Sequence, residues 1–381
     1  MKLSRRDLLL VVGLFPVVGG GAAALFQACA VEPDKPDTVR QEVLRETVSV
    51  VMLKVLDDLQ AQTSVLVAAV TALEATPSLD TLGAAQAAFR TARGTWHQSQ
   101  AFYIGPSQDI SVTGETIDSW PAANDRIEML VTGSGAVDLD AVTKVGANMR
   151  GFPGIEYSLF DSAQGNDAVL ARLTEETLGV RRLALLHSQA QDLADKCGKL
   201  RAAWGSPDAG YAHDLGEAGL GNGAFERQRD GIDEILTGML YLAELMVMNK
   251  FAKPLGIDSN GAIHPEFEEA PRSDGTNAAL HDNLVGLKAI YTCQYGQGSG
   301  HSLSEAVRAS NPDADTRFLA ALDAAIAAVD TIPPPFRTTL VGDVTPIQNA
   351  YQKTRDVKST LVMEVAGALG ASIGFGYSDS D

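Results

Sequence analysis

The sequence is poor in cysteine, and this scarcity excludes two classes of protein. Its 381 residues include three cysteines, so a small disulfide scaffold is ruled out. The cysteines do not have the close spacing of a zinc or iron–sulfur site. Cys29 lies near the N-terminus, and only Cys197 and Cys293 follow it. These two could pair in an oxidising compartment, but the sequence does not give the distance between them.

Positive charge is also scarce. There are 30 Lys and Arg residues against 48 Asp and Glu residues, and the formal net charge is −18. Proteins that bind nucleic acids or anionic lipids need a basic surface, so the charge argues against both as partners. An acidic surface suits cations or basic ligands, although many exported proteins are acidic simply to stay soluble.

Histidine is rare, with six residues in the whole chain. None forms a His-x-x-x-His or His-Glu-x-x-His pattern, so the common helical zinc motifs are absent. The glycine-rich segment 296–300 lacks the Lys-Ser or Lys-Thr of a phosphate loop, and we expect a turn there. The segment 264–269 holds one histidine and three glutamates. It could bind a cation weakly, but we expect it to be a solvated acidic loop.

The N-terminus resembles an export signal rather than part of the fold. Lys2, Arg5 and Arg6 precede an apolar run that extends from Leu8 to Phe26. The start is similar to a twin-arginine signal. The residues before Cys29 resemble a lipobox, in which Cys29 would carry the lipid. Cleavage to a free secreted protein and a retained membrane anchor are the alternatives.

Cleavage before Cys29 would make the mature chain still more acidic. It would remove three positive charges and one negative, which moves the net charge from −18 to −20. We therefore expect a protein of the periplasm or cell envelope that is held at the membrane by a lipid anchor.

The remaining chain has the spacing of apolar residues that is typical of helices. From Asp37 to Leu73 apolar residues recur three or four positions apart. Pro77 breaks this helix and Ser78 can cap the next one, which we expect to run to about Tyr103. Further helices are predicted at 122–132, 138–149, 153–161, 166–204, 208–218, 224–253, 276–293, 302–309, 312–331 and 345–369.

No convincing alternation of a β-strand occurs, so the fold class is predicted to be all-α. Two tandem up-and-down four-helix bundles suit the length. We expect the export signal at 1–29, an N-terminal bundle at 30–205 and a C-terminal bundle at 206–381. The long loop from Ile104 to Pro121 is of a length that is often functional.

Several blocks carry a resemblance to a known family. They are Gln86 to Phe102 with the following Gly105-Pro106, Ile117 to Pro121, Asp125 to Glu128, Met149 to Tyr157, Arg272-Ser273 with Asp282 to Leu287, and Val357 to Phe375. In this order they resemble the imelysin family, whose members are classed as M75 peptidases and as iron-regulated envelope proteins. The resemblance extends over about 40–375 and implies the two helical bundles.

The sequence departs from the family pattern at two positions of the expected site. The family has Gly-x-His-x-x-Glu where this chain has Gly151, Pro153 and Glu156, so proline replaces the histidine. Gln100 stands where the family has Glu. Proline in the first turn and Glu156 near a helix N-terminus also have a purely structural interpretation. A ligand role for Glu156 stays open beside it.

The candidate metal or ligand site therefore consists of Glu156, Gln100 and His97. His97 lies three residues before Gln100 on one helix face and could supply the lost imidazole. The residues that could line a shared pocket are Trp96, Arg93, Asp118, Trp120 and Tyr157. Packing in a bundle core is the alternative for the two tryptophans.

Together these features predict an exported envelope protein that binds a metal ion or a small ligand. The resemblance implies iron or another metal ion as the cofactor or cargo, an iron or metal uptake setting, and transport proteins of the envelope as partners. One alternative is a metal-dependent M75-type peptidase, although the lost histidine argues against catalysis. A structural or partner-binding lipoprotein is the other.

Overall fold

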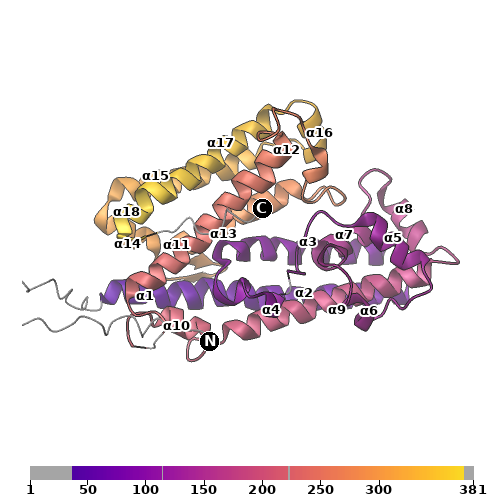
Figure 1. The fold of residues 1–381 in the computed structure, drawn as a ribbon, viewed down its shortest axis with the longest axis horizontal. Coiled ribbons are helices and arrows are strands. Elements are labelled where there is room, and N and C mark those ends of the chain that lie inside the picture. The colour runs from indigo at the N-terminus through magenta and orange to yellow at the C-terminus, as the bar shows by residue number, and fades with distance from the viewer. Residues whose placement is uncertain (1–36, 114, 222–223, 373–381) are drawn as a thin grey trace, which may run out of the picture. The chain divides into compact units, whose positions relative to one another are not determined.

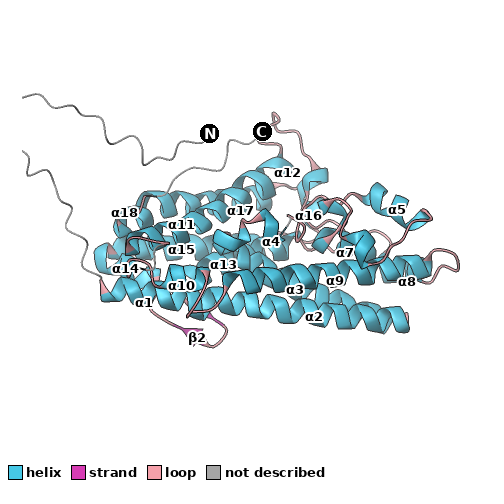
Figure 2. Cartoon of the chain, turned by 60° about the horizontal axis from the view of Figure 1, so that its bottom comes forward, coloured by secondary structure: helices cyan, strands magenta, loops and turns pink. Residues whose placement is uncertain are grey.

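The computed structural model describes residues 37–113, 115–221 and 224–372. All of them belong to one compact unit. The predicted export signal and Cys29 lie outside the described residues. The fold is all-α, as predicted, and helices dominate the view in Figure 2. The one small sheet in the described part is a hairpin of β1 (Gln294–Tyr295) and β2 (Gly298–Ser299).

The first group of packed helices is formed by α2 (Leu53–Ala75), α3 (Leu79–Ser99) and α9 (Gly179–Trp204). These three lie alongside one another in Figure 1. A capping box of Ser78 and Thr81 begins α3, as the sequence predicts. Shorter segments of this half are α1 (Thr38–Glu46), η1 (Thr47–Met52), η2 (Gln100–Phe102), η3 (Gly105–Ser107), α4 (Ile110–Thr113), α5 (Asn124–Thr132), α6 (Leu139–Val142), η4 (Ala147–Met149), α7 (Gly151–Leu159) and α8 (Gly165–Leu173).

The second group contains α11 (Gln228–Leu245), α13 (Thr276–Thr292), α15 (Pro312–Asp330) and α17 (Thr345–Thr360). Its shorter segments are α10 (Tyr211–Gly216), η5 (Met246–Ala252), α12 (Lys253–Leu255), η6 (Pro265–Phe267), α14 (Leu303–Ser310), α16 (Phe336–Val341), η7 (Leu361–Val365) and α18 (Ala366–Leu369). The two groups follow one another along the chain, and the boundary at 205 stays a prediction.

The two groups are joined by α3 and α13, which pack against each other. Gly286 of α13 allows this approach, because a Cβ atom there would lie 2.4 Å from the backbone oxygen of Gln98. One hydrophobic core runs through both groups, from Val43 to Leu369. Cys197 and Cys293 are both buried free thiols.

One continuous helix among the described residues, Gln228–Leu255, is long and apolar enough to cross a membrane. In the fold, 67% of the apolar 18-residue window within this helix is buried. It packs against η2 and α17, and these contacts are those of a core helix.

Candidate metal centre

Polar side chains from both halves of the chain meet where α3 and α13 pack. We call this group the polar cluster. Its members are Arg93, His97, Gln100, Asp118, Glu156, Lys250, Glu269 and Asn283. Buried polar groups are costly unless they find partners, so a group of this size in a helical core calls for an explanation.

Helix α3 supplies the first face of the cluster. Arg93 and His97 lie one helical turn apart and are both buried. Arg93 Nε donates to His97 Nε2 at 3.3 Å, and His97 Nδ1 lies 3.3 Å from Gln100 Oε1. Because Nε2 accepts a hydrogen bond, the proton of the neutral ring belongs on Nδ1.

The loop after α4 contributes Asp118, whose side chain is only 2% exposed. Trp96 Nε1 donates to its Oδ2 atom at 3.0 Å. Its Oδ1 atom lies 3.6 Å from Arg93 Nη2 but has no hydrogen-bond partner. One oxygen of this buried carboxylate is therefore free to bind a ligand.

Helix α7 contributes Glu156, and the helix begins as the sequence predicts. Gly151 has φ +57°, and a Cβ atom there would lie 2.2 Å from the backbone oxygens of Thr116 and Ile117. Pro153 follows in the first turn. Glu156 Oε1 accepts hydrogen bonds from Ser273 N at 3.0 Å and Ser273 Oγ at 2.5 Å. Its Oε2 atom lies 3.3 Å from Arg93 Nη1. These donors explain a buried Glu156 without any ligand.

The second half of the chain contributes Lys250, Glu269 and Asn283. Lys250 lies in the π-helix η5, a type of helix that often occurs at functional sites. Its side chain is fully buried, and Nζ donates to Glu269 Oε1 and Asn283 Oδ1, both at 2.8 Å. Asn283 Nδ2 in turn donates to the His97 carbonyl and to Gln100 Oε1, both at 2.8 Å.

Three potential ligands converge within the cluster. The three residues are His97, Asp118 and Glu269. Each offers one ligand atom, and these three atoms lie within 4.8 Å of one another. Glu269 Oε2, like Asp118 Oδ1, is buried without a hydrogen-bond partner. One imidazole and two carboxylates are a ligand set for iron, manganese or zinc. The residues therefore fit a divalent metal ion, provided that the three side chains move closer together when it binds.

Burial and neighbouring charges shift the pKa values of all three residues. The pKa of His97 is lowered to about 3, mainly by burial. The charges of Lys250 and Arg93 also lower it, whereas the charge of Glu269 acts in the opposite direction. Burial raises the pKa of Asp118 to about 6, although Arg93 acts in the opposite direction. Burial would also raise the pKa of Glu269, but Lys250, His97 and Arg93 together lower it to about 2. His97 is thus neutral at neutral pH, and a metal ion would have to displace either the Nδ1 proton or the hydrogen bond from Arg93 Nε.

The charges of the cluster leave a small negative excess at neutral pH. Asp118, Glu156 and Glu269 are balanced by only two permanent cations, Arg93 and Lys250. A cation would be attracted by the remaining negative charge. It would also have to compete with the arginine and the lysine that already hold the carboxylates.

Six of the eight residues that the sequence singled out lie in or against the cluster. These are Arg93, Trp96, His97, Gln100, Asp118 and Glu156. Tyr157 faces elsewhere, since its hydroxyl donates to Glu128, and Trp120 is partly exposed. Of the expected ligands His97, Gln100 and Glu156, only His97 belongs to the group that can converge on one ion.

The candidate site predicted from the sequence did not include Lys250, Glu269, Asn283 or Ser273, although weak cation binding by the segment that contains Glu269 was an open alternative. The prediction of a solvated acidic loop was wrong for Glu268 and Glu269, which are 2% and 3% exposed. Arg337 and Thr276 bind Glu268, and Lys250 binds Glu269, so partners distant in the sequence draw these residues inward. A lone lysine in the apolar stretch 239–252 was the available signal.

The model of the imelysin family, peptidase M75, matches residues 52–362. Iron-regulated protein A of Synechococcus elongatus is 25% identical over 324 residues, which cover 84% of this chain and 83% of that protein.

Two solved structures share the fold. An iron-regulated protein A precursor from Parabacteroides distasonis has a TM-score of 0.73 at 24% identity, with 89% of this chain and 96% of that chain covered. An imelysin-like protein from Psychrobacter arcticum has a TM-score of 0.70 at 16% identity, with 90% and 99% covered. With its family match extending over most of its length and a fold shared with these proteins, this chain belongs to the imelysin family.

Proposed function

We propose that this protein is an exported envelope protein that binds a metal ion at His97, Asp118 and Glu269. The observation that carries the proposal is the convergence of three buried ligand atoms within 4.8 Å. Two of these side chains keep a carboxylate oxygen without a hydrogen-bond partner. Metal coordination is one of the few ways to satisfy such an oxygen.

The ligand chemistry favours iron, manganese or zinc over calcium and magnesium. Calcium and magnesium prefer all-oxygen ligand sets, whereas this set includes an imidazole. The relatives named iron-regulated protein A support an iron or metal uptake setting. In that setting the protein works with transport proteins of the envelope.

Arg93 and Lys250 make the binding weaker and more readily reversible than in a bare carboxylate site. Arg93 lies 3.6 Å from Asp118, and Lys250 donates to Glu269 at 2.8 Å. An incoming ion replaces part of these interactions, which offsets some of its binding free energy. Such a balance suits a protein that captures an ion and later releases it.

A metal-dependent peptidase is the alternative, favoured by the family match to peptidase M75. Its catalytic metal would need an open coordination position that a peptide can reach. Arg93, His97 and Glu269 are each less than 5% exposed, which argues against access. Chelator-sensitive cleavage of a peptide library would favour the peptidase. A structural lipoprotein would show neither cleavage nor metal binding.

The proposal is tested by titrating the purified protein from Ala30 onward with Fe²⁺, Mn²⁺ and Zn²⁺ under anaerobic conditions. We expect one ion per chain for at least one metal. Glu269→Gln keeps the size of the side chain but removes its charge, and it should weaken binding by about 100-fold or more, because outer partners alone account for 10- to 100-fold.

Glu266→Gln is the matched control, because Glu266 lies in the same segment and is exposed. It should bind the metal as the natural protein does. Equal binding by Glu269→Gln and Glu266→Gln would exclude the proposed site, provided that both variants melt cooperatively. Lack of binding by the natural protein would leave the structural lipoprotein as the better interpretation.

A further inference from the structure

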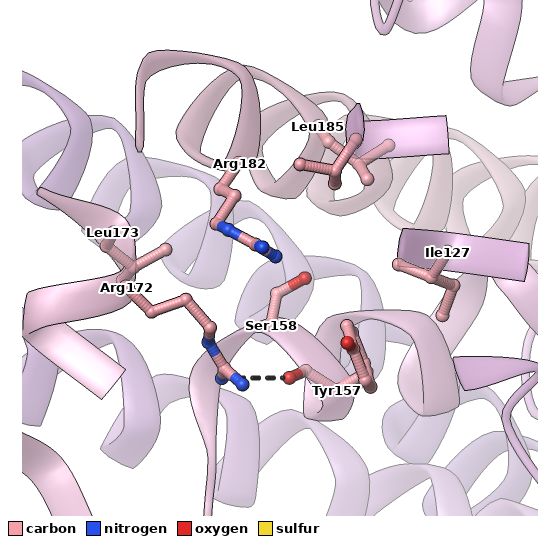
Figure 3. A pocket seen from close by; sticks show the side chains of 8 residues that line it. Ile127, Tyr157, Ser158, Arg172, Leu173, Arg182 and Leu185 are labelled. Atoms are coloured by element: carbon pink, nitrogen blue, oxygen red, sulfur yellow. Dashed lines mark hydrogen bonds between the residues drawn. The ribbon is translucent and has the colours of Figure 1, made fainter. Parts of the chain in front are cut away.

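A small cavity lies beside α7, on a different helix face from Glu156. Tyr157 and Ser158 of α7 line it together with Arg172 of α8 and Arg182 of α9 (Figure 3). The remaining wall is apolar and includes Ile127, Leu173 and Leu185. None of these residues belongs to the polar cluster, so the cavity is separate from the metal centre.

Arg182 presents an unused donor near this cavity. Its Nη1 and Nη2 atoms donate to the two oxygens of Glu128 at 2.6 and 2.8 Å. The Nε atom is buried and has no hydrogen-bond partner. A buried N–H group without a partner costs free energy, so an acceptor at this point would stabilise the fold.

Arg172 is also poorly satisfied. Its one hydrogen bond to the protein, to the Tyr157 carbonyl, is long at 3.4 Å, and Asp161 lies 3.9 Å away. Asp161 is closer to Arg272, at 3.3 Å. Burial lowers the pKa of Arg172, and the charge of Arg272 lowers it further. The Asp161 carboxylate, at 3.9 Å, is too far away to accept a hydrogen bond from this guanidinium.

The local charges show the same deficit. In their close ion pairs, Arg172, Arg182 and Arg272 share the carboxylates of Glu128 and Asp161, while the exposed Glu175 acts on Arg182 from farther away. The close pairs therefore leave one guanidinium without a carboxylate of its own, beside a cavity with an apolar wall. In a chain with a net charge of −18, a local excess of positive charge is unusual.

Ser158 supplies a third donor. Its hydroxyl has only long hydrogen bonds, at 3.3 Å to the Gly154 carbonyl and 3.5 Å to Gln189 Oε1. The hydroxyl can therefore turn toward a better acceptor. In Figure 3 the side chains of Arg172 and Arg182 lie on either side of Ser158.

We propose that this cavity binds one small monovalent anion of the size of chloride. The ligands are the Arg172 guanidinium, Arg182 Nε and the Ser158 hydroxyl. The cavity has room for a body of about water size, so a chloride ion, which is somewhat larger, needs a small outward movement of the side chains, and phosphate and larger organic anions are excluded. A single negative charge matches the positive excess. Water would accept from the same donors, but its own hydrogens would face the apolar wall.

The test uses chloride-free protein and the ³⁵Cl NMR linewidth during a sodium chloride titration at constant ionic strength. We expect saturable broadening in the natural protein. Arg172→Gln should weaken the affinity at least 10-fold, and Ser158→Ala should weaken it several-fold. Arg126→Gln is the matched control, since Arg126 is exposed on the neighbouring helix α5. It should bind chloride as the natural protein does.

A bromide soak of crystals gives a second, independent measurement. An anomalous peak between Arg172 and Arg182 is expected. The proposal is overturned if no peak appears there, or if Arg172→Gln and Ser158→Ala broaden the ³⁵Cl signal as strongly as the natural protein. Metal binding does not enter either measurement, so the result is independent of the proposed function.

Discussion

At the scale of the residue, the altered family motif has a structural explanation. Pro153 lies in the first turn of α7, where a missing N–H group costs little. Glu156 is held by Ser273 and Arg93. The imidazole of the cluster comes instead from His97 on α3, whose role as a metal ligand stays a prediction. The family motif of this chain thus stabilises the cluster from one side without supplying an imidazole.

Lys250 provides a test of how the cluster contributes to stability. Lys250→Met should lower the free energy of unfolding by about 3–5 kcal/mol, because it leaves the buried Glu269 without its closest cation. Denaturant unfolding at pH 7 measures this. Lys288→Met is the control, since Lys288 pairs with Asp323 on the surface, and its effect should stay within about 1 kcal/mol. A similar loss in both variants would contradict the prediction.

The residues that sequence reasoning found differ from those it missed in a simple respect. Arg93, His97 and Gln100 share one helix face, and their spacing is visible in the sequence. Glu269 and Lys250 meet across the fold, and no local pattern indicates their contact. Long-range pairing of buried charges depends on tertiary packing, which spacing along a single helix does not encode.

At the scale of the element, the apolar periodicity predicted most of the helices. The structure differs from the predicted ranges mainly at irregular points. The expected helix at 166–204 is split into α8 and α9, and α16 was not predicted. The long first and last helices contain the π-helical turns η1 and η7, and η5 follows α11. Lys250 lies within η5, so an irregular turn that apolar periodicity does not predict carries this member of the cluster.

The contact between α3 and α13 gives a prediction at this scale. Gly286→Ala should destabilise the protein by about 1–3 kcal/mol, because the new methyl group would meet the Gln98 backbone rather than a movable side chain. Thermal unfolding monitored by circular dichroism measures the loss. Gly367→Ala in α18 is the control, since a Cβ atom there has nothing within 4 Å, and it should be neutral or slightly stabilising. Equal melting temperatures for the two variants would refute a tight helix contact.

At the scale of the whole molecule, the family, the all-α class and the order of the helices were accessible from the sequence. They rest on many weak signals spread over most of the chain. The lipid anchor rests on a few residues at the N-terminus and stays a prediction. The chain has 48 acidic residues. This acidity is compatible with an exported protein but does not by itself indicate export.

The anchor can be tested in cells. Cys29→Ala should abolish incorporation of radioactive palmitate and move the protein from the membrane fraction to the soluble one. Cys197→Ala is the matched control, because Cys197 is a buried thiol of α9 and should keep both the label and the membrane association. A soluble, unlabelled natural protein would favour cleavage to a free secreted form instead.

The polar cluster draws on residues from Arg93 to Asn283, and this distribution would link the proposed ion binding to the folding of the whole unit. Neither half of the chain holds His97, Asp118 and Glu269 together. An ion that binds only the complete fold stabilises it by about 2.7 kcal/mol at a hundred times its dissociation constant. The melting temperature of this protein would therefore report how much metal its compartment offers.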